Sequence, residues 1–514
     1  MVVHRSGTSG RAKLALGILL LGYAVIEAIA GAPRSPLVPP LPAGVGVPAW
    51  SARLARLVPL DRLGPSALTA ITIGVLVGLI GAFALLLIEA WSGRVRLALV
   101  LGTAAAAMAF VSVGPLLLSR DVYSYAAYGR IVALHGVNPY VVRPSSFPTD
   151  PFTLVAAPQW VRTPSLYGPA FTLLSAAIAR LWSSSPSGTI VAFKVVAGLA
   201  MLAATGMIAA AGRAWRPGGG ALAAAAVGLN PVIVVHTVGG AHNDAILAMC
   251  LAGAALMAGT SVRDRASGSR GIAVSSLGVT VVLTLGAFVK VFGAVPLLIW
   301  VWAVIRTARG EARFRVAAEH IGAAVALGLA VSLPFLAGTH TFHWLATTST
   351  VEGWASGPRL VARGAEALGR AIAGQSLGDA FARTTDAAFL VLFAAILWRV
   401  LLRRESGSAG ADWAIALLLL ALALPYLVPW YAAWFVVLLP LGEDEALLWL
   451  GVAAGGLLAL TGVPADPAVA SGLWHSMMLA VHYVGAPIML ALLGVCVWRA
   501  IGVTSWRRHT VDAG

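Results

Sequence analysis

Long apolar runs fill most of this chain and constrain its fold more than any other feature. Of its 514 residues, 59% are hydrophobic and only 11% are charged, which is too little polar surface to cover a soluble core. A helix needs about 20 mainly apolar residues to cross a membrane. We therefore expect an all-α polytopic membrane protein with about 14 spans, at 13–30, 66–90, 97–118, 189–212, 219–238, 242–259, 271–288, 291–305, 318–336, 386–403, 411–428, 431–441, 445–462 and 481–500.

The distribution of arginine and lysine predicts which ends of the spans face the cytoplasm. Cytoplasmic loops carry an excess of these residues, and here they group in alternate connections, for example Arg94 with Arg96 and Arg306 with Arg309. This pattern predicts that both termini are cytoplasmic. The net charge of +15 comes from these topological anchors, so no nucleic-acid partner is expected. The first apolar stretch is long for a signal peptide, and we expect an uncleaved anchor.

The same pattern places three long connections on the outer face, at 31–65, 119–188 and 337–385. The segment from Tyr167 to Trp182 is apolar enough to be a span, but it would invert every later loop if it crossed the membrane. We therefore expect it to form a re-entrant or juxtamembrane helix on the outer face. The sequence contains no Walker motif and no Gly-rich nucleotide fingerprint, which argues against an ATP-driven pump.

A carboxylate stands where the second of these connections begins. The run is Ser119-Arg120-Asp121-Val122-Tyr123-Ser124-Tyr125, and it directly follows an apolar segment. Partial desolvation at the membrane boundary would raise the pKa of Asp121, and the nearby Arg120 would lower it. Transfer to a sugar hydroxyl needs such a general base. The alternative is a structural role, with Asp121 capping a short helix from Val122 to Ala133.

Two short outer turns add polar groups that are unsuited to contact with lipid. The first is Gly239-Gly240-Ala241-His242-Asn243-Asp244, where the glycines allow close backbone approach and the three side chains could bind an anion at a helix N-terminus. A helix-capping role for Asn243 or Asp244 is equally compatible with this run. The second is Lys290, a cation between two apolar spans, which suits a lipid phosphate or, alternatively, snorkelling to the interface.

Aromatic residues follow these polar groups and could stack on pyranose rings. They include Tyr123 and Tyr125 and the aromatic residues of the runs Asn138-Pro139-Tyr140, Tyr167-Gly168-Pro169 and Pro429-Trp430-Tyr431. Anchoring at the membrane interface is the common role of tyrosine and tryptophan in membrane proteins and remains the alternative for part of this set.

In this order and combination, the motifs resemble those of the actinobacterial polyprenol-phosphate-mannose-dependent α-1,6-mannosyltransferases, which belong to the GT-C membrane glycosyltransferases. The likeness runs from about Leu97 to the C-terminus, whereas residues 1–96 match only in being hydrophobic. The chain accordingly divides into an N-terminal membrane hairpin with its outer loop, residues 1–96, and a GT-C transmembrane catalytic module, residues 97–514. Tyr128 departs from the pattern, because glutamine is frequent there.

The resemblance implies an enzyme of the cell membrane with its active site on the periplasmic face. It would transfer mannose from polyprenyl-phosphate mannose to an α-1,6-mannan or lipomannan-type lipoglycan, with inversion at the anomeric carbon and Asp121 as general base. Arg120, His242 and Lys290 would bind the donor phosphate. No metal or cofactor is required. The residues expected to bind sugar or acceptor are Tyr123, Tyr125, Asn138, Tyr140, Tyr167, Asn243, Asp244, Trp430 and Tyr431.

Two alternatives stay open on the sequence. A lipid-linked sugar flippase or transporter should place ionisable residues near the bilayer midplane, whereas here they gather at the outer ends of spans, with Glu27 and Glu89 as partial exceptions. A GT-C transferase for another sugar, or for a protein acceptor, would carry the same features.

Overall fold

The computed structural model describes residues 7–215, 218–267, 272–345, 353–402, 409–442, 444–469 and 471–511. Across these ranges the chain is built of helices and contains no β-strand. The principal helices are α1 (Gly10–Ala30), α3 (Pro65–Trp91), α4 (Leu97–Ser112), α8 (Pro186–Trp215), α9 (Gly219–Gly228), α10 (Asp244–Ser267), α11 (Ile272–Val289), α12 (Ala294–Thr307), α13 (Ala312–Ser332), α15 (Gln375–Leu402), α16 (Ala409–Ala423), α18 (Glu445–Ala459) and α20 (Ala486–Val511).

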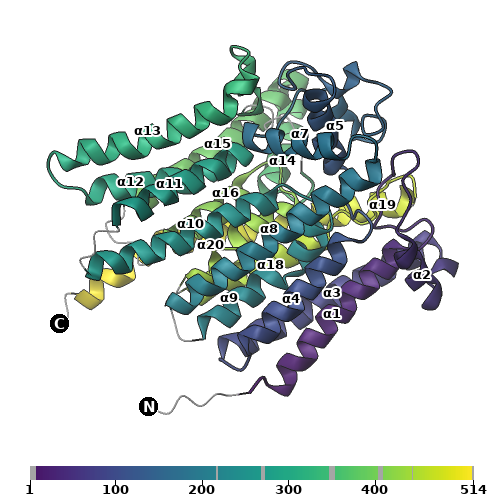
Figure 1. Ribbon diagram of the computed structural model, residues 1–514, viewed down its shortest axis with the longest axis horizontal. Helices are drawn as coiled ribbons and strands as arrows, with labels where there is room; N and C mark the ends of the chain where they lie inside the picture. Colours follow the sequence, from purple (N-terminus) through teal and green to yellow (C-terminus); the bar gives the residue numbers. More distant parts are fainter. Residues whose placement is uncertain are drawn as a thin grey trace.

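These helices lie side by side in one bundle, and shorter helices cover one of its ends (Figure 1). The covering helices are α2 (Ala49–Leu57), α5 (Asp121–Ala133) and α7 (Pro169–Leu181). The helix α19 (Ser471–Ala480) instead continues into α20 as part of one long span. The start of α1 and the end of α20 lie at the opposite end of the bundle (Figure 1). The start of the first described helix and the end of the last therefore share one side of the molecule, and helices α5 and α7 of the long connection 119–188 lie on the other.

The membrane character expected from the sequence is confirmed, whereas the number of spans is not. Six helices of the described chain are long and apolar enough to cross a membrane, or seven if α9 and the π-helical segment η3 (Val232–Val238), bent by 46°, count as one span. Eight further apolar stretches of 10–17 residues lie in shorter helices or in parts of longer ones such as α10 and α11. Proline lacks the N–H group that continues a helix, and Pro115 and Pro425 closely follow the ends of α4 and α16, while Pro231 lies between α9 and η3.

The apolar segment expected on the outer face forms α7, a helix of only 13 residues. It packs against α5 and α11 rather than running through the bundle. Most buried apolar side chains belong to one large core between the long helices. A second, smaller core lies beneath α5 and α7 and includes Val122, Tyr125, Phe171 and Phe193. This smaller core fixes the two covering helices on the end of α8.

Gly168, the residue before α7, permits a close approach that holds α7 to the end of α11. Its N–H group donates to the carbonyl of Val289 at 3.3 Å, and a Cβ atom at this position would lie 2.0 Å from the carbonyl oxygen of Phe288. No side chain fits at that distance without a backbone shift. Glycine is therefore a packing requirement at this position.

We predict that Gly168→Ala lowers the free energy of unfolding by about 1–3 kcal/mol, the usual cost of overpacking a tight contact. Thermal unfolding in detergent or nanodiscs measures the effect. The matched control is Gly364→Ala in α14 (Gly357–Ala373), where an added Cβ meets nothing within 4 Å and helix propensity favours alanine. Equal melting temperatures for Gly168→Ala and the wild type would contradict the packing argument.

Candidate active site

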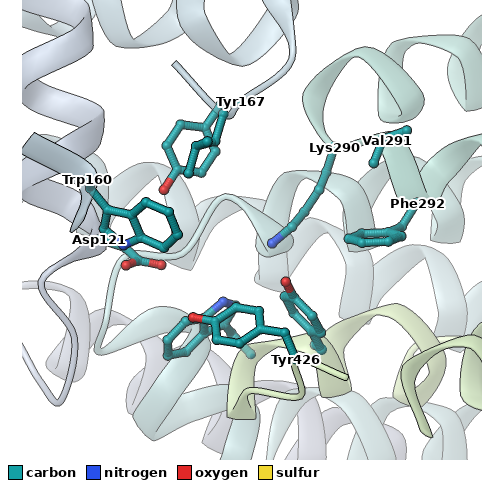
Figure 2. Close-up of a pocket in the computed structure, with 10 residues that line it drawn as sticks. Asp121, Trp160, Tyr167, Lys290, Val291, Phe292 and Tyr426 are labelled. Atoms are coloured by element: carbon teal, nitrogen blue, oxygen red, sulfur yellow. The ribbon is translucent and has the colours of Figure 1, made fainter. Parts of the chain in front are cut away.

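A cleft opens at the covered end of the bundle, where four separate segments meet. It encloses about 560 Å³, including space open to solvent. Its walls come from the start of α5, the loop before α7, the turn after α11 and the segment after α16. The lining residues are Asp121, Trp160, Leu166, Tyr167, Lys290, Val291, Phe292, Tyr426, Trp430 and Tyr431. Figure 2 shows the Asp121 carboxylate and the Lys290 ammonium pointing into the same space from opposite sides.

Asp121 is the first residue of α5, and its side chain does not cap the helix. Arg120 occupies the N-cap position, and no side chain makes a capping hydrogen bond. The backbone N–H of Asp121 donates to Ser119 Oγ at 3.1 Å, so the carboxylate is left to face the cleft. Burial raises the pKa of Asp121 to about 7; Lys290 lowers this pKa and Asp244 raises it. A carboxyl group with this pKa can accept a proton near neutrality.

The turn before α10 brings His242 to the same carboxylate. His242 Nδ1 lies 3.7 Å from Asp121 Oδ2 and 3.4 Å from the hydroxyl oxygen of Tyr125. The imidazole ring stacks on the indole of Trp430 with 3.7 Å between centroids. Burial holds the pKa of His242 well below its usual range, so the ring is neutral. Its Nε2 atom and both side-chain amide atoms of Asn243 are buried without a hydrogen-bond partner.

Gly240 is what allows this turn to close. A Cβ atom there would lie 2.5 Å from the carbonyl oxygen of His236 and 2.8 Å from Nε2 of His242. The next residue, Ala241, has a φ of +58°, in the left-handed region. The run of glycines therefore brings the imidazole against the backbone.

Lys290 is held by a buried counter-charge. Its Nζ donates to both oxygens of Asp244, at 2.7 and 2.9 Å, and the indole N–H of Trp434 donates to the same carboxylate at 2.5 Å. The ammonium also lies over two aromatic rings, 4.6 Å from the centroid of Tyr431 and 5.4 Å from that of Trp434. The lysine is thus paired within the protein rather than extended to the interface.

Aromatic side chains form the rest of the walls and support one another. Tyr125 meets Tyr167 edge to face, with ring centroids 4.7 Å apart, and Tyr431 stacks on Trp434 at 3.9 Å. Such pairs fix ring orientation as well as burying apolar area. The cleft therefore combines flat apolar surfaces with one carboxylate and one ammonium group.

Several residues expected at the site lie behind the cleft or beside it. Arg120 forms an ion pair with Asp466 at 3.5 Å. The hydroxyl of Tyr123 donates to the carbonyl of Pro40 at 2.8 Å. Asn138 donates through its amide to the carbonyl of Phe335 at 2.9 Å.

Tyr140 also lies behind the cleft, because its hydroxyl donates to the carbonyl of Tyr167 at 2.7 Å. It thereby supports a wall residue from below without lining the cleft.

The structure adds residues that the sequence reasoning missed, namely Trp160, Phe292, Tyr426 and Trp434. One signal was present, because Trp434 follows Tyr431 by three residues, which is nearly one helical turn. The others stand in apolar surroundings that give no sign of a site. In the described part of the chain, no group of three or more His, Cys, Asp and Glu side chains is arranged to hold a metal ion.

Comparison with known proteins adds to this geometry. Residues 38–306 match the sequence model of a family described as "Alpha-(1->6)-mannopyranosyltransferase, N-terminal domain". The chain is 28% identical over 349 residues to alpha-(1->6)-mannopyranosyltransferase A of Mycobacterium tuberculosis, covering 64% of this chain and 63% of that protein. It is 27% identical over 354 residues to alpha-(1->6)-mannopyranosyltransferase B of Corynebacterium glutamicum, covering 66% and 58%. The chain thus spans less than two thirds of either relative.

Proposed function

The chain belongs to the alpha-(1->6)-mannopyranosyltransferase family, and from that premise we propose that it is a membrane mannosyltransferase with its active site in the cleft between Asp121 and Lys290. Its donor is a polyprenyl-phosphate mannose, and its acceptor is an α-1,6-mannan or lipoglycan on the periplasmic face. The observation that carries the proposal is the pairing of one carboxylate and one ammonium across an aromatic-walled cleft.

The proposed step is a single displacement with inversion. The acceptor hydroxyl oxygen forms a bond to the anomeric carbon of mannose while the bond from that carbon to the phosphate oxygen breaks. The hydroxyl proton passes to the Asp121 carboxylate, and the bonding electron pair leaves with polyprenyl phosphate. The β-linked donor gives an α-linked product. The pKa of about 7 supports Asp121 as the base, because a base works best with a pKa near the working pH.

The leaving phosphate gains negative charge in this step and needs stabilisation. Lys290 is the cation that lines the cleft, and a partly desolvated ammonium stabilises developing charge more strongly than one in water. The neutral His242 adds a hydrogen bond through its ring, since its Nε2 and the amide of Asn243 have no partner within the protein. We assign these three side chains to the donor phosphate.

The sugar rings occupy the aromatic walls. Tyr167, Trp430, Tyr431 and the additional Tyr426 present ring surfaces to the cleft, and pyranose rings stack on such surfaces through their C–H faces. The polyprenyl chain lies in the bilayer beside the cleft. A donor on a lipid carrier also suits an outer-face enzyme, because nucleotide sugars are absent there. Helix α5, whose first residue lines the cleft, lies at the end of the bundle away from the start of α1 and the end of α20, and this position supports the orientation (Figure 1).

We predict that Asp121→Asn lowers mannose transfer by about 10²–10⁴-fold, the usual contribution of a general base, while the protein stays folded in the membrane. The assay uses purified protein in nanodiscs, radiolabelled polyprenyl-phosphate mannose and a short α-1,6-mannoside. Asp61→Asn, in the 31–65 connection, is the control and keeps wild-type activity. Full activity in Asp121→Asn would exclude Asp121 as the base.

The pH dependence of the reaction follows from the same group. Asp121 acts only when it is deprotonated, so kcat/KM should fall about tenfold per pH unit below a midpoint near 7. Because Lys290 lowers the pKa of Asp121, its replacement by methionine should move this midpoint upward. A value of kcat/KM that stays constant between pH 5 and 8 would show that the protonation of Asp121 does not control the rate.

We also predict that Lys290→Met raises KM for the donor by about tenfold or more, since a charge-assisted hydrogen bond contributes about 1.5–3 kcal/mol. KM for the acceptor should change by less than about twofold. The control for loss of a lysine is Lys13→Met, an exposed position in the first turn of α1. An equal rise in the KM values for donor and acceptor would show that Lys290 has no specific role in donor binding.

A further inference from the structure

A second lysine, Lys194, lies inside α8 and has no part in the chemistry above. Its side chain is fully buried, within a helix long and apolar enough to cross the membrane. The ammonium donates to the carbonyl of Gly114 at 2.7 Å and to the carbonyl of Pro115. A charge in such surroundings is costly unless it is paired, and two carbonyl groups supply dipoles but no opposite charge.

A second buried titratable group, Glu27 in α1, lies beside the same segment. Glu27 is also fully buried, and it interacts electrostatically with Lys194. Its carboxylate packs against the backbone of Gly114, because a Cβ atom there would lie 1.9 Å from Oε2 of Glu27. Neither carboxylate oxygen has a hydrogen-bond partner in the described structure. The segment at Gly114 and Pro115 thus contacts a buried carboxyl group and a buried ammonium group.

This segment leads directly to the proposed base. After α4 ends at Ser112, the chain runs without regular helix to the start of α5 at Asp121. The N–H of Leu117 donates to the carbonyl of Gly239, in the His242 turn, at 3.0 Å, and the N–H of Leu118 donates to the carbonyl of Leu37 at 2.7 Å. Leu118 has a φ of +62°, a conformation that a branched side chain adopts only when its surroundings enforce it.

We propose that Lys194 is a positioning residue that sets the place of Asp121 relative to His242. By binding the carbonyls of Gly114 and Pro115, the ammonium fixes the start of the segment whose middle is bonded to the His242 turn and whose end carries Asp121. The kinetic consequence rests on the proposed function, because it assumes that Asp121 is the base. A displacement of about 1 Å at a reacting group costs up to about 10²-fold in rate.

The alternative is that Glu27 and Lys194 contribute only to stability. Comparison of a single variant with a double variant separates the two roles. Lys194→Met keeps the length of the side chain, removes both carbonyl contacts and leaves the buried Glu27 carboxyl group without the ammonium. Glu27→Gln/Lys194→Met also removes the carbonyl contacts but leaves no carboxyl group unpaired. Positioning and stability therefore respond differently to the second substitution.

The experiment measures melting temperature, kcat and donor KM for the wild type, both variants and the exposed control Lys13→Met. We expect Lys194→Met to lower the melting temperature and the double variant to recover most of that loss. The kcat value should stay at least about tenfold below wild type in both variants. Donor KM should stay within about twofold of wild type, since Lys290 and the aromatic walls are unchanged. The control should match the wild type throughout.

Recovery of both melting temperature and kcat in the double variant would overturn the proposal, and so would wild-type kcat in Lys194→Met. If Lys194→Met does not fold, the double variant decides by its kcat alone. A wild-type protein that transfers no mannose would refute the proposed function instead. In that case the melting temperatures still test the pairing: without recovery in the double variant, Glu27 is not the electrostatic partner of Lys194 and the proposal fails.

Discussion

The ion pair between Lys290 and Asp244 is the interaction on which the site depends. In a bundle made almost entirely of apolar helices, a lysine is retained only with a counter-charge, and Asp244 supplies it at 2.7 Å. The pair joins the end of α11 to the start of α10, and the indole of Trp434 fixes the carboxylate from a third segment. In the described part of the chain, no lysine or arginine forms an ion pair with Asp121. Asp121 lies across the cleft from Lys290, whereas Asp244 is bonded to Lys290 and Trp434, and this difference in contacts separates the roles of the two carboxylates.

The cleft is assembled at helix ends rather than within helices. Asp121 begins α5, His242 stands in the turn before α10, and Lys290 follows the last residue of α11. Helix ends leave backbone groups and side chains free of the regular hydrogen-bond pattern, so chemistry can be placed there without breaking a span. The covering helices α5 and α7, fixed by Gly168 and by the smaller apolar core, then enclose these ends. The polar groups of the site are thus gathered at the end of the bundle where α5 and α7 lie (Figure 1).

The sequence predicted the parts of this arrangement that break an apolar pattern. Asp121, His242 and Lys290 stood out because a polar residue at the end of an apolar run needs an explanation, and all three lie at or beside the cleft. Asp244 was marked as a sugar or anion group, whereas the structure shows it as the partner of Lys290; pairing between distant segments cannot be read from spacing. Tyr426 and Phe292 were missed because an aromatic residue in an apolar run has the same pattern whether it faces lipid, core or cleft. The expected count of 14 spans is not confirmed: six or seven helices of the described chain are long and apolar enough to cross a membrane. Apolar composition alone does not show where a residue such as Pro115 ends a helix.

The most direct test of the account is an experimental structure of the protein in lipid nanodiscs with polyprenyl-phosphate mannose bound to Asp121→Asn. We predict that the donor phosphate lies within hydrogen-bonding distance of Lys290 Nζ and that the mannose ring lies against the aromatic walls. The anomeric carbon should face residue 121. A donor bound with its phosphate elsewhere, for example at Arg120 outside the cleft, would contradict the assignment of this cleft as the active site.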